Sequence, residues 1–107
     1  MNNRAGMKLT MLFCCAALPL VSASAFGAEA EAGRRLAQLR CSPCHIVAPN
    51  QRQEIADAPP FEMIGRKFGF DAAMLIVNLM GPHAKMNFSL GRPDAEDIAA
   101  YIGTLAR

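Results

Sequence analysis

The feature that most constrains this chain is the run Cys41-Ser-Pro-Cys44-His45. Two cysteines at i and i+3 lie on one side of a helical turn, so their sulfurs can reach one edge of a flat molecule. The histidine that follows rises over the same turn and can meet the centre of that molecule. C-x-x-C-H is the attachment signal of a c-type haem. The sequence therefore predicts one covalently bound haem c, with thioether links at Cys41 and Cys44 and with His45 as an axial iron ligand.

Three other kinds of site use the same residue types. A thioredoxin-like redox pair follows a strand of a βαβ unit, and no such strand pattern precedes Cys41. A zinc site needs four ligands, a count met by Cys41, Cys44, His45 and His83, although adjacent Cys44 and His45 close a tetrahedron poorly. A plain disulfide leaves His45 without a role. Haem attachment accounts for both the spacing and the histidine, and the other three remain alternatives.

The first 27 residues have the pattern of an export signal. Two cations, Arg4 and Lys8, precede an apolar stretch that ends in small residues. This is the layout of a secretory signal peptide, with cleavage expected after Ala25 or Gly27. The uncharged stretch 9–28 is also long enough to span a membrane, so an uncleaved anchor is the alternative. We expect a periplasmic protein with no membrane contact unless the leader is retained.

Charge and length narrow the possible functions of the remaining domain, residues 28–107. The whole chain has 11 Lys and Arg against 9 Asp and Glu, and loss of Arg4 and Lys8 leaves nine of each. A near-neutral chain lacks the basic surface of a nucleic-acid binder. A single domain of this size has a marginal core unless a disulfide, a metal or another group completes it. A buried haem would complete that core.

The pattern of apolar residues predicts an all-α fold. Helices are expected at 31–40, 61–68 and 72–80, and from Pro93 toward the C-terminus, because apolar positions recur at helical spacing and Gly or Pro ends each run. Asp71 is positioned to cap the third helix. No segment alternates as a strand does. The apolar faces expected on the first and last helices comprise Ala32, Leu36 and Leu39, and Ile98, Tyr101, Ile102 and Leu105.

The second axial position of the iron has several candidates. Methionine in that position raises the potential of a cytochrome haem. Met63, Met74 and Met80 fall in helical apolar patterns, where core packing is the default. Met86 instead lies in a loop between two helices, from which a side chain can reach over the open haem face. His83, in the same loop, is the other candidate.

Taken together, four segments resemble the small bacterial class I c-type cytochromes, monohaem proteins with His/Met ligation. These segments are the attachment motif at 41–45, Ala58-Pro-Pro-Phe at 58–61, His-Ala-Lys-Met-Asn-Phe-Ser-Leu at 83–90 and Asp-Ile-Ala-Ala-Tyr-Ile at 97–102. The resemblance covers about residues 31–106. It implies a small cytochrome c fold, in which the N- and C-terminal helices cross and short helices surround one covalently bound haem.

The family pattern G-H-x-x-M-P-x-F places the axial methionine at Met86. This chain departs from the pattern, because Pro82 separates Gly81 from His83 and Asn87 replaces the usual proline. The family also implies that a proline carbonyl accepts a hydrogen bond from the axial histidine, a role that Pro59 or Pro60 matches.

The resemblance further implies where the helices cross and which residues line the haem pocket. Gly33 and Tyr101 match the glycine and the aromatic residue at the helix crossing. Residues that match the haem-pocket lining, but that core packing would equally use, are Phe61, Ile64, Phe68, Leu75, Leu79, Phe88 and Leu90.

The function that follows is one-electron transfer by a periplasmic carrier. Two protein ligands leave no iron position for a substrate, so an enzyme is not expected. The partners would be redox proteins such as a dehydrogenase, a reductase or a terminal oxidase, which dock through small interfaces at the haem edge. Two alternatives are a cytochrome subunit of a dehydrogenase or oxidase complex, and a haem-based sensor or peroxidase-like enzyme. Local basic patches at Arg34, Arg35, Arg66 and Lys67 are either docking features or a plain solvated surface.

Overall fold

The protein is all-helical in the part of the chain that its computed structural model describes, which is residue 17 and residues 28–52, 58–83 and 86–107. Four helices follow one another in that part: α1 (Ala30–Arg40), α2 (Phe61–Lys67), α3 (Ala72–Met80) and α4 (Arg92–Gly103). The all-α prediction is confirmed. The predicted leader at 1–27 lies outside the described residues except for Ala17. None of the helices described is long and apolar enough to cross a membrane.

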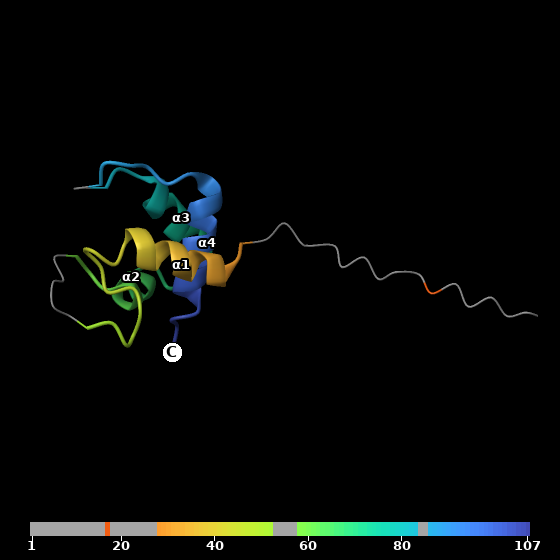
Figure 1. Ribbon diagram of the computed structural model, residues 1–107, viewed down its shortest axis with the longest axis horizontal. Helices are drawn as coiled ribbons and strands as arrows, with labels where there is room; N and C mark the ends of the chain where they lie inside the picture. Colours follow the sequence, from red (N-terminus) through yellow and green to blue (C-terminus); the bar gives the residue numbers. More distant parts are fainter. Residues whose placement is uncertain (1–16, 18–27, 53–57, 84–85) are drawn as a thin grey trace, which may run out of the picture.

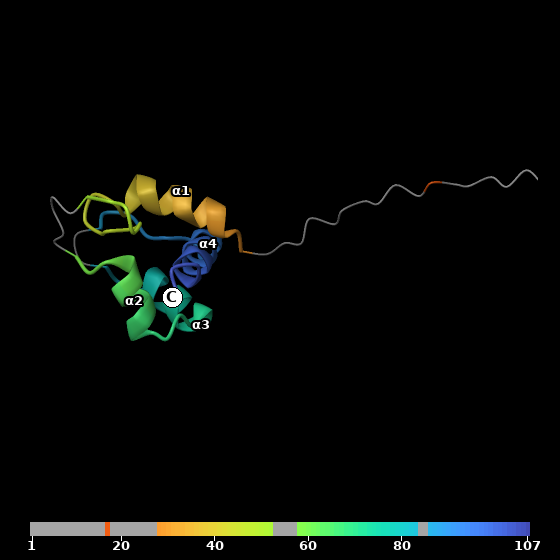
Figure 2. The same cartoon turned by 90° about the horizontal axis from the view of Figure 1, so that it is seen from below.

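Helix α4 is the centre of the fold. Figure 2 shows α1 on one side of α4 and both α2 and α3 on the other, and α4 contacts all three. Its buried face contains the predicted Ile98, Tyr101 and Ile102 together with Ala95 and Ala99, which the apolar pattern did not include. Small side chains at two of these positions let neighbouring helices approach closely.

The crossing of α1 over α4, visible in Figure 1, is the most extensive contact between the described helices. A Cβ atom added to Gly33 would lie 1.9 Å from the backbone oxygen of Asp97, so only glycine fits there. The Tyr101 hydroxyl donates a hydrogen bond to the Val47 carbonyl, which joins α4 to the loop after the attachment motif. The predicted crossing of the N- and C-terminal helices is therefore confirmed.

The buried stripe of α1 differs from the one expected. Gly33 and Ala37 are its buried residues, whereas Leu36 is half-buried and Leu39 is 75% exposed. The close approach at Gly33 turns that side of the helix toward α4 and leaves Leu39 on the opposite side. The expectation that Leu39 belongs to the apolar face was wrong.

Three methionines expected in the core are also exposed. Met63 is 62% exposed, Met74 50% and Met80 42%. On α2 the buried residues are Phe61 and Gly65, and on α3 the buried residue is Leu75. The methionines lie on other faces of these helices, which corrects the prediction that they fill the core.

Local signals explain where α3 and α4 begin and how α2 ends. The Asp71 carboxylate accepts a hydrogen bond of 2.9 Å from the Met74 amide, as the predicted cap requires. Pro93 lies in the first turn of α4, one residue after Arg92 rather than at the first position. After α2, both Gly69 and Phe70 have positive φ. The Phe70 ring then folds back over Gly65, where an added Cβ would lie 2.2 Å from the ring.

Candidate functional site

The attachment motif forms a tight turn directly at the end of α1. The Cys41 carbonyl accepts hydrogen bonds from the amides of Cys44 and His45, at 3.1 and 2.8 Å. The Ser42 hydroxyl donates to the Gln38 carbonyl, which extends the helix end into the motif. Both thiols are free, and Cys44 is exposed whereas Cys41 is half-buried. The two sulfurs and the histidine thus come from one turn, as the spacing predicts.

The electrostatic surroundings of Cys41 act in two directions. Burial raises the pKa of the Cys41 thiol, and the positive charge of neighbouring Arg40 opposes part of that rise. Because the thiolate is the nucleophilic form of cysteine, burial makes Cys41 less reactive while it remains a thiol.

The His45 ring is held by one well-placed hydrogen bond. Its Nδ1 lies 2.6 Å from the carbonyl oxygen of Pro59. A carbonyl can only accept a hydrogen bond, so Nδ1 carries the proton and the lone pair of Nε2 remains for a metal. The Phe61 ring lies 5.5 Å from the imidazole, centroid to centroid, and packs beside it. Of the two prolines suggested by the resemblance, Pro59 is therefore the one whose carbonyl meets His45.

Gln51 shapes the loop that follows the motif, a role that no pattern in the sequence predicts. Its Nε2 donates to the His45 carbonyl at 2.9 Å, and its Oε1 accepts from the Val47 amide at 2.8 Å. A longer contact of 3.4 Å reaches the Ser42 carbonyl. One half-buried amide side chain thus satisfies backbone groups on both sides of the turn and fixes the path of the chain around His45.

A cavity of about 650 Å³ lies beside the loop between α3 and α4. Met86, Met80 and His83 line it, and so do three of the predicted pocket residues, Leu79, Phe88 and Leu90. The other predicted pocket residues do not line this cavity. Phe61 and Leu75 are buried in the hydrophobic core, and the half-buried Ile64 and Phe68 pack against it.

Two side-chain contacts join the attachment turn to the loop that carries Met86. The rings of His45 and His83 lie 5.8 Å apart, centroid to centroid, with an angle of 78° between their planes. The Arg40 guanidinium lies over the Phe88 ring, 5.0 Å from its centroid. Segments more than 35 positions apart in the sequence thus meet at the candidate site.

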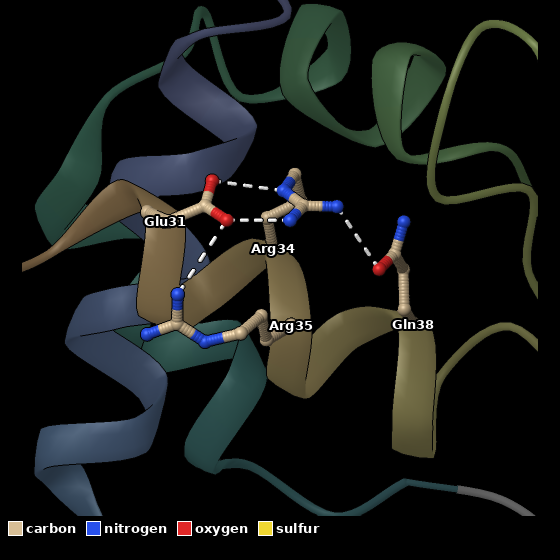
Figure 3. A network of polar contacts seen from close by, with 4 residues as sticks. All are labelled: Glu31, Arg34, Arg35 and Gln38. Atoms are coloured by element: carbon tan, nitrogen blue, oxygen red, sulfur yellow. Dashed lines mark hydrogen bonds and ion pairs between the residues drawn. The ribbon is translucent and has the colours of Figure 1, made fainter.

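The basic residues considered for docking are mostly paired with acidic neighbours. Figure 3 shows Glu31 bound to both Arg34 and Arg35, and Arg34 also bonded to Gln38. On α2, Arg66 pairs with Glu62 at 2.6 Å. These pairs reduce the net positive charge of both surfaces. Strong steering of a partner by these cations is therefore not expected.

Comparison with known proteins decides the family. The chain is 45% identical over 85 residues to Cytochrome c-552 of Bradyrhizobium diazoefficiens, and the match covers 78% of this chain and 82% of that protein. The chain belongs to the c-type cytochromes. No protein-family model and no solved structure matches it. As a c-type cytochrome it is an electron-transfer protein that carries covalently bound haem c, which confirms the predicted family and cofactor.

The residues present fit such a haem. The free thiols of Cys41 and Cys44 belong to the same turn as His45, and the bond to Pro59 leaves the His45 Nε2 able to bind a metal. The cavity is open to solvent, its described lining residues come from the end of α3 and the loop after it, and the contact between the His45 and His83 rings connects it to the attachment turn. Among the described residues, no three His, Cys, Asp or Glu side chains gather as a metal site.

Proposed function

We propose that this c-type cytochrome is an exported one-electron carrier whose haem is attached at Cys41 and Cys44, with His45 and Met86 as the axial ligands. The observation that carries the proposal is the hydrogen bond from His45 Nδ1 to the Pro59 carbonyl. It fixes the tautomer and the ring orientation of a histidine placed directly after two free cysteines. Such a bond also raises the basicity of the ligating nitrogen.

Met86 is supported as the second ligand by its position. It lines the cavity and is half-buried, and its side chain packs against the hydrophobic core. Core packing on one side restricts the side chain, so less conformational entropy is lost when the sulfur binds a metal. Met63 and Met74 are exposed on α2 and α3 and do not line the cavity. Met80 does line it, but it belongs to α3, whereas Met86 lies in the loop.

This arrangement suits electron transfer better than catalysis on a substrate. The haem iron supplies a one-electron couple, and binding of a methionine sulfur to the iron raises the reduction potential of that couple. With His45 and Met86 both holding the iron, no iron position would remain for a substrate. The chain's own part is to hold both ligands in place in both oxidation states.

The decisive experiment is a redox titration with optical spectra of the wild type and of Met86→Ala. We expect the wild-type ferric protein to show the weak red absorption band of a sulfur–iron bond, and Met86→Ala to lose the band and to have a lower potential. Met63→Ala is the matched control, because Met63 is exposed and outside the cavity, and it should keep the band. A band that survives in Met86→Ala would disprove the ligand assignment.

Attachment is tested on a denaturing gel. Thioether links keep the haem colour with the polypeptide after denaturation, and Cys44→Ser should weaken or abolish this retention. Export is a separate proposal that rests on the leader pattern at 1–27. It predicts mature protein in the periplasmic fraction, with an N-terminus at Phe26 or Ala28 by mass spectrometry. Retention of the whole leader in the membrane fraction would favour an anchored form.

A second candidate is a subunit of a larger redox complex. The observation in its favour is the outer face of α3, where Val77 is 69% exposed and Met74 50%. Neighbouring exposed apolar side chains are a feature of protein contact surfaces. Gentle purification distinguishes the two functions, because a free carrier elutes alone whereas a subunit elutes with a large partner.

A further inference from the structure

We propose that His83 is a substitute axial ligand, which binds the haem iron when Met86 is absent from that position. This inference rests on the proposed His45/Met86 ligation and goes beyond it. It assigns a second metal-binding side chain to the loop between α3 and α4. The consequence is an iron that stays closed to external ligands even without its methionine.

The first support is that His83 and Met86 lie close together. The Met86 amide donates to the His83 carbonyl at 3.4 Å, and both residues line the same cavity. This backbone hydrogen bond holds the two residues close together whichever side chain is used. Exchange between them therefore needs rearrangement of one loop and leaves the helices in place.

The second support is the position of the His83 ring relative to His45. The two rings lie 5.8 Å apart at 78°, so the His83 imidazole is already beside the histidine that we assign to the iron. His83 is exposed, so its ring lies at the surface of the molecule beside the cavity. Met80, also at the cavity, is the other side chain with a suitable donor atom among the described lining residues.

The chemistry of the exchange is simple and needs no co-reactant. Neutral imidazole is a common metal ligand, which donates a nitrogen lone pair. In Met86→Ala the iron has no sulfur from position 86, so one nitrogen–iron bond forms, any water bound at that position leaves to solvent, and no electron is transferred. The iron then has two histidine ligands and keeps both axial positions filled.

The test compares three holoprotein variants: Met86→Ala, Met86→Ala with His83→Gln, and Met86→Ala with Met80→Ala. Electron paramagnetic resonance and optical spectra of the ferric proteins report spin state and ligand type. We expect Met86→Ala to be low-spin without a sulfur band, and the Met80 double variant to look the same. The His83 double variant should become high-spin, because glutamine fills similar space but is a poor iron ligand.

Carbon monoxide binding by the ferrous proteins gives a second readout. Apparent affinity falls in proportion to the open fraction of the iron, so occupancy by His83 for nine-tenths of the time weakens binding about tenfold relative to the His83 double variant. Circular dichroism of each variant checks that the four helices are retained. If Met86→Ala and the double variant Met86→Ala with His83→Gln bound carbon monoxide with equal affinity, the inference would be overturned.

The remaining outcomes separate this inference from the proposed function. A high-spin Met86→Ala protein would refute the substitute ligand and leave His45/Met86 ligation intact. A low-spin state that persists in the His83 double variant would show that another residue is the substitute. A sulfur band in Met86→Ala, abolished by Met80→Ala, would instead refute the proposed ligation itself.

Discussion

The crossing of α1 over α4 and the cavity beside the Met86 loop differ in how closely their protein atoms pack. At the crossing, protein atoms fill the space so fully that Gly33 has no room for a methyl group against Asp97. Beside the loop, a cavity of about 650 Å³ lies next to Met86 and Phe88. The chain itself fills the first region, and in the proposed holoprotein the haem would fill the second.

This difference separates what each region contributes to function. The crossing fixes α1, and the end of α1 fixes the attachment turn at Cys41–His45. The cavity side instead brings residues that can bind or cover the haem, and their arrangement depends on what they contact. On the proposed ligation, a chain of this length would use a rigid half to position the cofactor and a cofactor-dependent half to ligate it.

The largest effect is expected from preventing attachment with Cys41→Ser and Cys44→Ser together. Without the haem, the cavity side has no group to pack against. We therefore expect the free energy of unfolding to fall by more than about 5 kcal/mol, which is the upper end of the range for truncating one core side chain. Denaturant unfolding followed by circular dichroism measures the loss. Amide hydrogen exchange makes the comparison sharper. In the variant without haem, the amides of α1 and α4 should keep more protection from exchange than the amides of the loop at 86–91. An unchanged unfolding midpoint would refute this division.

The next largest effect is expected at the crossing itself. Gly33→Ala places a Cβ 1.9 Å from the Asp97 oxygen, so the two backbones must separate. Overpacking of this kind costs about 3 kcal/mol or more when backbone rather than a flexible side chain is the obstacle. The matched control is Gly103→Ala, where an added Cβ meets nothing within 4 Å. Thermal unfolding should drop sharply for Gly33→Ala alone, and equal behaviour of the two variants would contradict the described crossing.

The two regions also differ in how far the sequence predicts them. Helix bounds came from local signals, such as the Asp71 cap and the glycine after α2, and these were correct to within a residue or two. The i, i+3 cysteines likewise needed only local geometry. The crossing was predicted through family resemblance at Gly33 and Tyr101, because helical periodicity alone favoured Leu39, which is exposed.

What the sequence did not predict depends on the path of the loops. Gln51 bonds to His45 and Val47 only because the chain turns back beside the motif. The choice of Pro59 over Pro60 depends on a single peptide orientation before α2. The Arg40–Phe88 contact joins segments that no local pattern relates. Contacts of this kind follow from tertiary packing, which apolar spacing does not encode.

A smaller effect is expected where the crossing meets the loop after the motif. Tyr101→Phe removes the hydrogen bond to the Val47 carbonyl and should cost about 1 kcal/mol, measured by denaturant unfolding at neutral pH. Burial raises the pKa of the Tyr101 phenol above its ordinary value of 10.0.

The pH dependence of that variant provides its control. Because the folded state holds the phenol proton more tightly than the unfolded state, this stabilisation is complete below about pH 10 and is lost as pH rises through the folded pKa. The difference between wild type and Tyr101→Phe should therefore shrink above pH 10. A difference that stays constant to pH 12 would show that the phenol titrates normally.

On the cavity side, loss of the contact between Arg40 and Phe88 should make it modestly easier for an external ligand to displace Met86 from the iron. Arg40→Gln keeps much of the stem but removes the cation, a loss of about 0.5–1 kcal/mol for an exposed cation–π pair. Imidazole binding to the ferric protein should tighten by about two- to five-fold, because the loop that carries Met86 is held less firmly. Lys67→Gln is the control, since Lys67 lies over the adjacent Phe68, 5.4 Å from its centroid, and joins no distant segment. Equal shifts in both variants would refute the assigned role.

The smallest effect is expected on the solvent face of α1, where Glu31 pairs with Arg34 and Arg35. The hydrogen bond from Arg34 lowers the pKa of Glu31, so any stabilisation is present above the ordinary pKa of 4.5 and is lost as pH falls. These side chains are exposed, and water and salt screen the attraction. Glu31→Gln should therefore leave the unfolding midpoint unchanged at moderate salt, both at pH 7 and at pH 4. If it instead destabilised the protein as much as Tyr101→Phe does, surface charge would share in holding α1 against α4, and close backbone approach at Gly33 would not suffice to explain the rigid half.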